Sequence, residues 1–140
     1  MKKYLRYGGL GIVFLWFFGG GVMHFINPDI FVAIVPPWVP YALAAVYISG
    51  FFEVVLALLI IWPKSRPMAG WGLVALTIAV TPANVHMWLH PELFPEVDPS
   101  DLSVRLVIQV VLLFTIWWST RIEQKGLEET GPGTLPGSTT

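Results

Sequence analysis

One carboxylate, that of Glu53, stands inside the apolar stretch 49–62, in which every other residue is uncharged. Because an ionised carboxylate is costly in lipid, an acid inside a membrane span commonly faces the protein interior and serves a proton or ligand site. We therefore predict that Glu53 turns away from lipid and is neutral or paired. Its candidate partners are Arg105, His24 and His86. The alternative is a structural role, in which Glu53 makes a hydrogen bond between helices.

The remaining polar residues of the apolar segments have spacings that place them near one another. Ser49 precedes Glu53 by four residues and Arg105 precedes Gln109 by four, so each pair shares a helix face. We expect a polar pocket in the outer half of a helix bundle, with Glu53 at its base. His24 and Asn84 have an alternative role as helix caps at the headgroup level. The predicted ligand-binding residues are Glu53, His24, Ser49, Asn84, His86, Arg105 and Gln109.

The spacing of His86 and His90 would present two imidazoles to one metal, but no fuller ligand motif accompanies them. We therefore predict neither a metal nor a haem. The sequence has no cysteine, which excludes disulfides and a thiol nucleophile. No complete catalytic constellation is present, so an enzyme is not predicted.

The elements that position these residues follow from composition. Hydrophobic residues make up 55% of the 140 residues and charged residues 12%, about half of what soluble domains carry. A spanning helix needs about 20 mostly apolar residues. The sequence predicts an all-α, four-transmembrane-helix bundle with helices over 8–26, 41–62, 68–89 and 102–120. One membrane domain, 1–121, is then followed by a disordered cytoplasmic tail, 122–140.

Charge predicts the orientation of these helices. The acids of the connecting segments gather on one side, and the other side carries Lys2, Lys3, Arg6, Lys64, Arg66, Arg121 and Lys125. Positively charged loops stay in the cytoplasm, so we expect both termini there and a multi-pass protein of the bacterial cytoplasmic (inner) membrane. The proline-rich loop 27–40 is expected to lie bent at the outer interface. The net charge of −1 indicates no nucleic-acid partner.

The chain carries a faint internal repeat. EVVLALLIIW (53–62) aligns with QVVLLFTIWW (109–118), and INPDIF (26–31) aligns with LHPELF (89–94). This pattern predicts two hairpins that arose by parallel duplication, as in some transporter halves. Glu53 and Gln109 would then hold equivalent positions, and a hydrogen bond from Glu53 to Gln109 or Ser49 is the structural alternative for the carboxylate.

Several motifs together resemble the DoxX family of small bacterial membrane proteins, in its DoxX-like branch. They are HF followed by Pro at 24–28, PPWVP at 36–40, SGFFE at 49–53 and PAN at 82–84, within a resemblance that covers about residues 8–120. The resemblance implies a four-helix membrane bundle. It also implies service in a membrane redox system for some members and assembly of other membrane proteins for distant relatives.

Three functions remain open from the sequence. The first is a pocket for a quinone, a lipid or another small amphipathic ligand. The second is a non-catalytic accessory subunit or assembly factor, whose partner is another membrane protein or a second copy of this chain. The third is a transporter of a small solute or protons, for which four helices leave little room. In all three the lipid bilayer is the surrounding partner.

Overall fold

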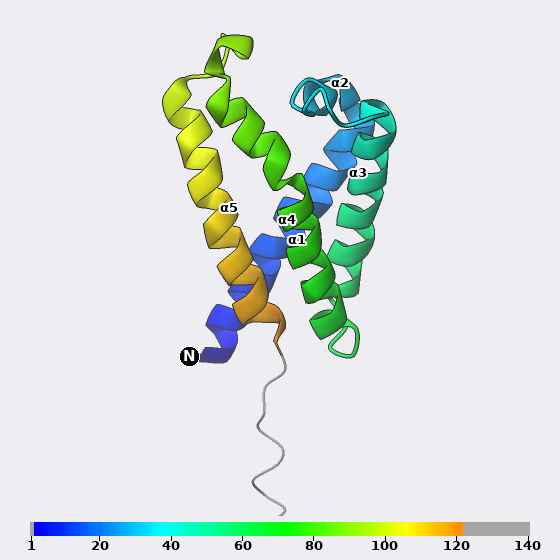
Figure 1. Ribbon diagram of the computed structural model, residues 1–140. Coiled ribbons are helices and arrows are strands. Elements are labelled where there is room, and N and C mark those ends of the chain that lie inside the picture. The colour runs from blue at the N-terminus through cyan, green and yellow to red at the C-terminus, as the bar shows by residue number, and fades with distance from the viewer. Residues whose placement is uncertain (1, 122–140) are drawn as a thin grey trace, which may run out of the picture.

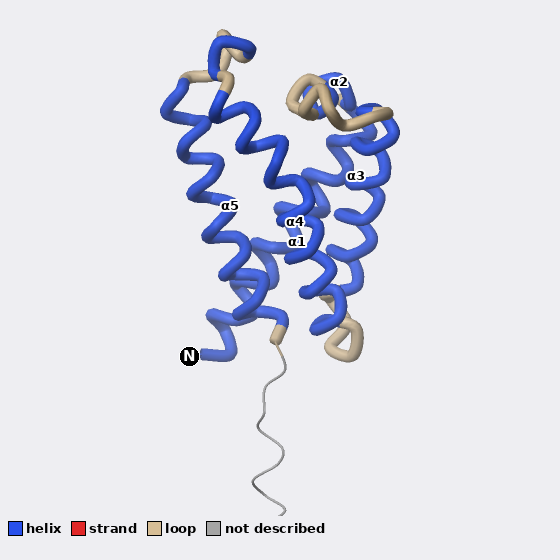
Figure 2. Tube along the Cα trace, viewed as in Figure 1, coloured by secondary structure: helices blue, strands red, loops and turns tan. Residues whose placement is uncertain are grey.

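The computed structural model of the protein describes residues 2–121, and within that range it is all-helical without strands (Figures 1 and 2). The elements in chain order are α1 (Lys2–Ile26), α2 (Pro28–Val32), α3 (Ala42–Leu59), α4 (Arg66–Leu89), the 3₁₀ turn η1 (Pro91–Leu93) and α5 (Pro99–Thr120). Helices α1, α3, α4 and α5 are long and apolar enough to cross a membrane. The chain is therefore a multi-pass membrane protein. The predicted tail, 122–140, lies outside the described residues.

The four long helices form two antiparallel hairpins. Helix α1 packs chiefly on α3, and α4 packs chiefly on α5, while α1–α5 and α3–α4 contacts join the hairpins. The start of α1, the end of α5 and the α3–α4 connection lie at one end of the bundle, and α2 and η1 lie at the other (Figure 1). Both connections at the α2 end enter a short helical segment at a proline, Pro28 or Pro91, within the two sequence segments that the internal repeat aligns.

Three predicted boundaries differ from the structure by more than two residues, and one of them is the start of α5, which lies at Pro99, three residues before its predicted position. Helix α1 begins at Lys2, six residues early, and the Arg6 guanidinium donates to backbone oxygens of Ser119 and Arg121 at the end of α5. Helix α3 ends at Leu59, three residues early. The Ser65 hydroxyl donates to the Leu59 carbonyl oxygen over 2.7 Å and so closes the helix end.

The packed core occupies the half of the bundle nearer the termini. Its buried members come from all four long helices: Leu10, Val13, Phe17, Ala57, Ile60, Ala69, Leu73 and Ile116. Close to α2 the two hairpins diverge, since the upper part of α4 leans toward α5 and away from α3 (Figure 1). The bundle is therefore tight at one end and open at the other.

Helices α1 and α3 cross closely at two glycines. A Cβ added to Gly50 would lie 2.6 Å from the Cβ of His24 and 3.0 Å from the Gly21 oxygen. By contrast, a Cβ added to Gly8 or Gly11 would meet nothing within 4 Å. Close helix approach in α1 thus occurs at Gly21, and it places His24 against α3.

The segment between α1 and α3 is compact rather than extended. After α2 the chain makes turns through Pro36, Pro37 and Pro40, and Tyr41 then enters α3 with φ at 55°. A non-glycine residue with that left-handed backbone is uncommon and reverses the chain sharply. The bent segment expected for 27–40 is present, and it covers one side of the diverging helices.

Candidate functional site

An open cavity of about 1160 Å³ lies between the two hairpins. All four long helices and the 28–39 segment contribute to its wall, which is mostly apolar. Six of the seven predicted site residues line it: Glu53, His24, Ser49, Asn84, Arg105 and Gln109. The volume is slightly above the range usual for small-molecule sites, about 300–1,000 Å³.

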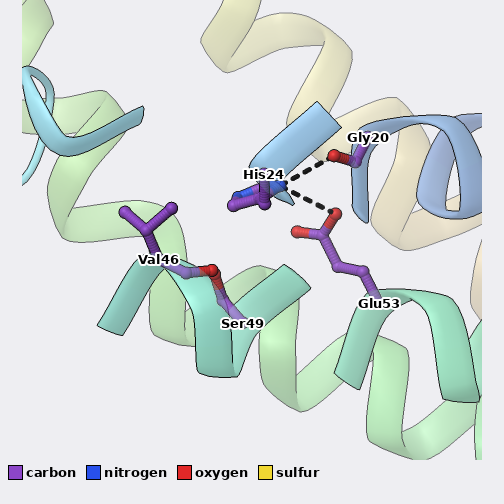
Figure 3. A network of polar contacts seen from close by, with 5 residues as sticks. All are labelled: Gly20, His24, Val46, Ser49 and Glu53. Carbon is purple, nitrogen blue, oxygen red and sulfur yellow. Dashed lines mark hydrogen bonds and ion pairs between the residues drawn. The ribbon is translucent and has the colours of Figure 1, made fainter. Parts of the chain in front are cut away.

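Glu53 and His24 form a buried pair on the first hairpin, and each is only 8% exposed (Figure 3). His24 Nδ1 lies 2.7 Å from the Gly20 carbonyl oxygen and 3.7 Å from Glu53 Oε2. A carbonyl oxygen only accepts, so Nδ1 carries the hydrogen. In the neutral ring Nε2 is then left as an acceptor. The pair thus offers a carboxyl group and an imidazole nitrogen to a ligand.

Contacts from α2 and α3 hold His24 in place. Phe31 of α2 stacks on its ring with centroids 3.8 Å apart, and the missing side chain at Gly50 of α3 leaves room for the His24 Cβ. Of the three partners considered for Glu53, His24 is the one that forms an ion-pair contact with it among residues 2–121. Packing contacts of this kind fix the orientation of a polar side chain.

Gln109 and Asn84 form a second polar pair on the other hairpin. Asn84 Nδ2 donates to Gln109 Oε1 over 2.7 Å. Gln109 Nε2 donates to the Thr81 hydroxyl and, over 3.3 Å, to the Thr77 carbonyl oxygen. Gln109 therefore bonds within its own hairpin, and the structure gives it no hydrogen bond to Glu53. The two repeat-equivalent residues each anchor a separate polar pair.

Ser49 and Arg105 line the cavity in different ways. The Ser49 hydroxyl donates to the Val46 carbonyl oxygen of its own helix over 3.0 Å, so this hydrogen bond does not join two helices. Arg105 is exposed, and Asp101, one turn earlier on α5, lines the same wall. Within residues 2–121 the side chains of Arg105 and Asp101 have no hydrogen-bond or ion-pair partner.

His86 does not belong to the wall of the cavity. It follows Asn84 by two residues, which turns it about 200° around the helix axis. Its ring instead lies beside that of His90, with centroids 4.8 Å apart. Among residues 2–121 no group of three or more histidine or acidic side chains could hold a metal ion.

Sequence reasoning did not assign Thr77, Thr81, Phe31 and Asp101 to the site. The two threonines lie at four-residue spacing, and Asn84 follows three residues later, so all three share the face of α4 that meets Gln109. That spacing was a usable signal. No sequence signal pointed to Phe31, because its ring reaches His24 only when α2 folds back over the end of α1.

Helix α4 continues through Pro82, and the Thr81 hydroxyl next to it donates to the Thr77 oxygen over 2.9 Å.

The fold and the cavity define a polytopic membrane protein with an intramembrane pocket. A protein-family model described as "Domain of unknown function (DUF8561)" matches residues 13–121. The chain belongs to that family, and the match includes the whole cavity wall. No curated protein and no solved structure matches the chain. None of these comparisons links it to the DoxX family.

Proposed function

We propose that this protein binds a small amphipathic molecule, such as a quinone or a lipid, in the cavity between its two hairpins. The observation that carries the proposal is one open cavity, walled by apolar side chains from all four long helices, that contains one buried and one partly buried polar pair. An apolar pocket with a few convergent polar groups is the usual form of a ligand site.

The polar pairs would orient the head of the ligand. Glu53 can donate a proton when it is neutral, and His24 Nε2 can accept one, so a hydroxyl or carbonyl head finds a complement there. Asn84 keeps a free carbonyl oxygen after its bond to Gln109. If the ligand is a quinone, the resemblance to DoxX proteins makes service in a membrane redox system the expected context.

The cavity is proposed to open toward the outside of a bacterial cytoplasmic membrane, with both termini in the cytoplasm. Support comes from charge. The end of the bundle that holds the start of α1 and the end of α5 carries Arg6, Lys64, Arg66 and Arg121, and the end near the cavity is acidic. Basic segments are retained on the cytoplasmic side.

Native purification in mild detergent followed by mass spectrometry tests the proposal. Wild type should retain an amphipathic small molecule, and Glu53→Gln, which removes the ionisable group at nearly constant volume, should retain less of it. Glu92→Gln is the matched control, because Glu92 is an acid outside the cavity wall.

Two results would contradict the proposal. One is a wild-type protein that carries no small molecule even after gentle extraction. The other is a stoichiometric protein partner, held equally by wild type and Glu53→Gln, with an empty cavity in both. That second result would favour an accessory subunit or assembly factor. Proton flux in liposomes that is lost in Glu53→Gln would instead favour a transporter.

A further inference from the structure

We infer that the occupant of the cavity is a single zwitterionic aminophospholipid, with its phosphate on Arg105 and its ammonium on Asp101. The inference rests on the proposed function and names the class of ligand. It is drawn from the charged side chains at the open end of the cavity, which make no hydrogen bond or ion pair with the two polar pairs deeper in the wall.

Arg105 is the single Lys or Arg at the acidic end of the described chain. It lines the cavity, is exposed and has no hydrogen-bond or ion-pair partner within residues 2–121. A guanidinium presents a planar fork of N–H donors that matches the oxygens of a phosphate, and such charge-assisted bonds are strong. A free guanidinium in the wall of an apolar cavity is therefore suited to a phosphate whose attached chains enter that cavity.

The depth of these side chains agrees with a lipid headgroup. Asp101 and Arg105 lie about 3 Å and 9 Å along α5 from its first residue, Pro99, at 1.5 Å per residue. The polar headgroup layer occupies roughly 5–7 Å on each side of the hydrocarbon core. A long arginine side chain reaches outward toward that layer. Gln109 lies about 6 Å deeper than Arg105, at the level where the polar linkage between headgroup and chains would follow.

The surrounding charges select among headgroups. Five acids lie at this end of the chain: Asp29, Glu92, Glu96, Asp98 and Asp101. A headgroup with a net negative charge would be repelled by them, whereas a headgroup that also carries an ammonium is attracted. Asp101 is the acid that shares the cavity wall with Arg105. The pair thus presents opposite charges one helical turn apart, as phosphate and ammonium require.

Lipid competition tests the inference. The full chain is reconstituted in vesicles with equal phosphatidylethanolamine and phosphatidylglycerol, re-extracted in mild detergent, and examined by native mass spectrometry and quantification of extracted lipid. Wild type should retain one phosphatidylethanolamine per chain in preference to phosphatidylglycerol. Arg105→Gln should lower phospholipid retention about tenfold or more, and Arg105→Lys should restore part of it.

Asp101→Asn separates recognition of the ammonium from a general loss of binding. It should keep phospholipid bound and raise the share of phosphatidylglycerol, while Glu96→Gln, an equal change of charge outside the cavity wall, should shift the ratio much less. The inference is overturned if wild type shows no preference, if both acid variants shift the ratio alike, or if Arg105→Gln retains phospholipid normally. Retention of a different amphiphile, lost in Glu53→Gln, would overturn this inference and leave the proposed function standing. Retention of nothing would overturn both.

Discussion

Glu53 is tolerated among apolar residues because its carboxyl group lies beside an imidazole and against small residues, not against lipid. His24 approaches it over 3.7 Å, and a Cβ on Gly20 would lie 3.2 Å from Glu53 Oε2. The approach depends on the two glycines at which α1 and α3 cross. At the scale of single residues, the absence of a side chain at Gly50 is as important to the site as the presence of one at Glu53.

Gly50→Ala should separate α1 from α3 and destabilise the protein by about 1–3 kcal/mol, since the new methyl group meets His24 and a backbone oxygen that cannot rotate away. Thermal unfolding in detergent measures this effect. Gly8→Ala makes the same chemical change in open space on α1 and should leave the unfolding midpoint unchanged or slightly raised. Equal loss in the two variants would mean that the crossing is not tight.

At the scale of elements, helix ends account for most polar contacts outside the cavity. Arg66 donates to the carbonyl oxygens of Ile60 and Ile61 just past the end of α3, over 2.8 and 3.0 Å. Asp98 caps the start of α5 and accepts from the Ser100 amide and hydroxyl. These contacts satisfy backbone groups that a helix leaves open at its termini.

The Asp98 cap should depend on pH. Hydrogen bonds from the Ser100 hydroxyl and amide stabilise the carboxylate and hold the pKa of Asp98 below its usual value. Because the folded-state pKa is lowered, the stabilisation is complete above the unfolded pKa of Asp and is lost as the pH falls through the lowered value. Amide protection at Ser100 and Asp101, measured by NMR in micelles, should therefore decline at acidic pH.

Two variants complete the test of the cap. Asp98→Asn still accepts a hydrogen bond but does not titrate, so its protection pattern at the start of α5 should vary less with pH than that of wild type. Asp98→Ala should lose the protection at every pH. If wild type and Asp98→Asn respond alike to acid, the carboxylate is not the capping group.

At the scale of the whole molecule, packing and charge divide the bundle in the same direction. The buried core gathers at the basic end with the chain termini, and the cavity opens near the acidic end. The two hairpins are packed together at the basic end and diverge at the acidic end. The cavity lies between the two hairpins, because neither hairpin alone encloses the space.

The absence of cysteine makes the orientation directly testable, because any introduced thiol is unique. Lys64→Cys, in the α3–α4 connection, should resist a membrane-impermeant maleimide in intact cells and react once the membrane is opened. Glu96→Cys, in the acidic connection before α5, should react in intact cells. The reverse pattern would place the cavity on the cytoplasmic side and contradict the proposed topology.

Much of the fold could be predicted from composition, whereas the contacts of the site could not. The four apolar segments were recognisable because each had to supply about 20 apolar residues, and the helix ends were close to their predicted positions except at Lys2, Leu59 and Pro99. Three features of the site could be seen only in the structure. They are the pairing of Glu53 with His24, the hydrogen bond between Asn84 and Gln109, and the position of His86 outside the cavity wall.

The sequence by itself determined that the chain has four membrane-crossing helices with one basic and one acidic end, because apolar length and charge are local properties that lipid and headgroups act on directly. Only the tertiary structure decided which polar side chains meet. That outcome depends on how far each helix is rotated and tilted, and packing sets both, as at Gly21 and Gly50. A rotation of about 100° per residue separates a cavity-facing Asn84 from an outward His86, and no local feature of the sequence specifies the starting angle.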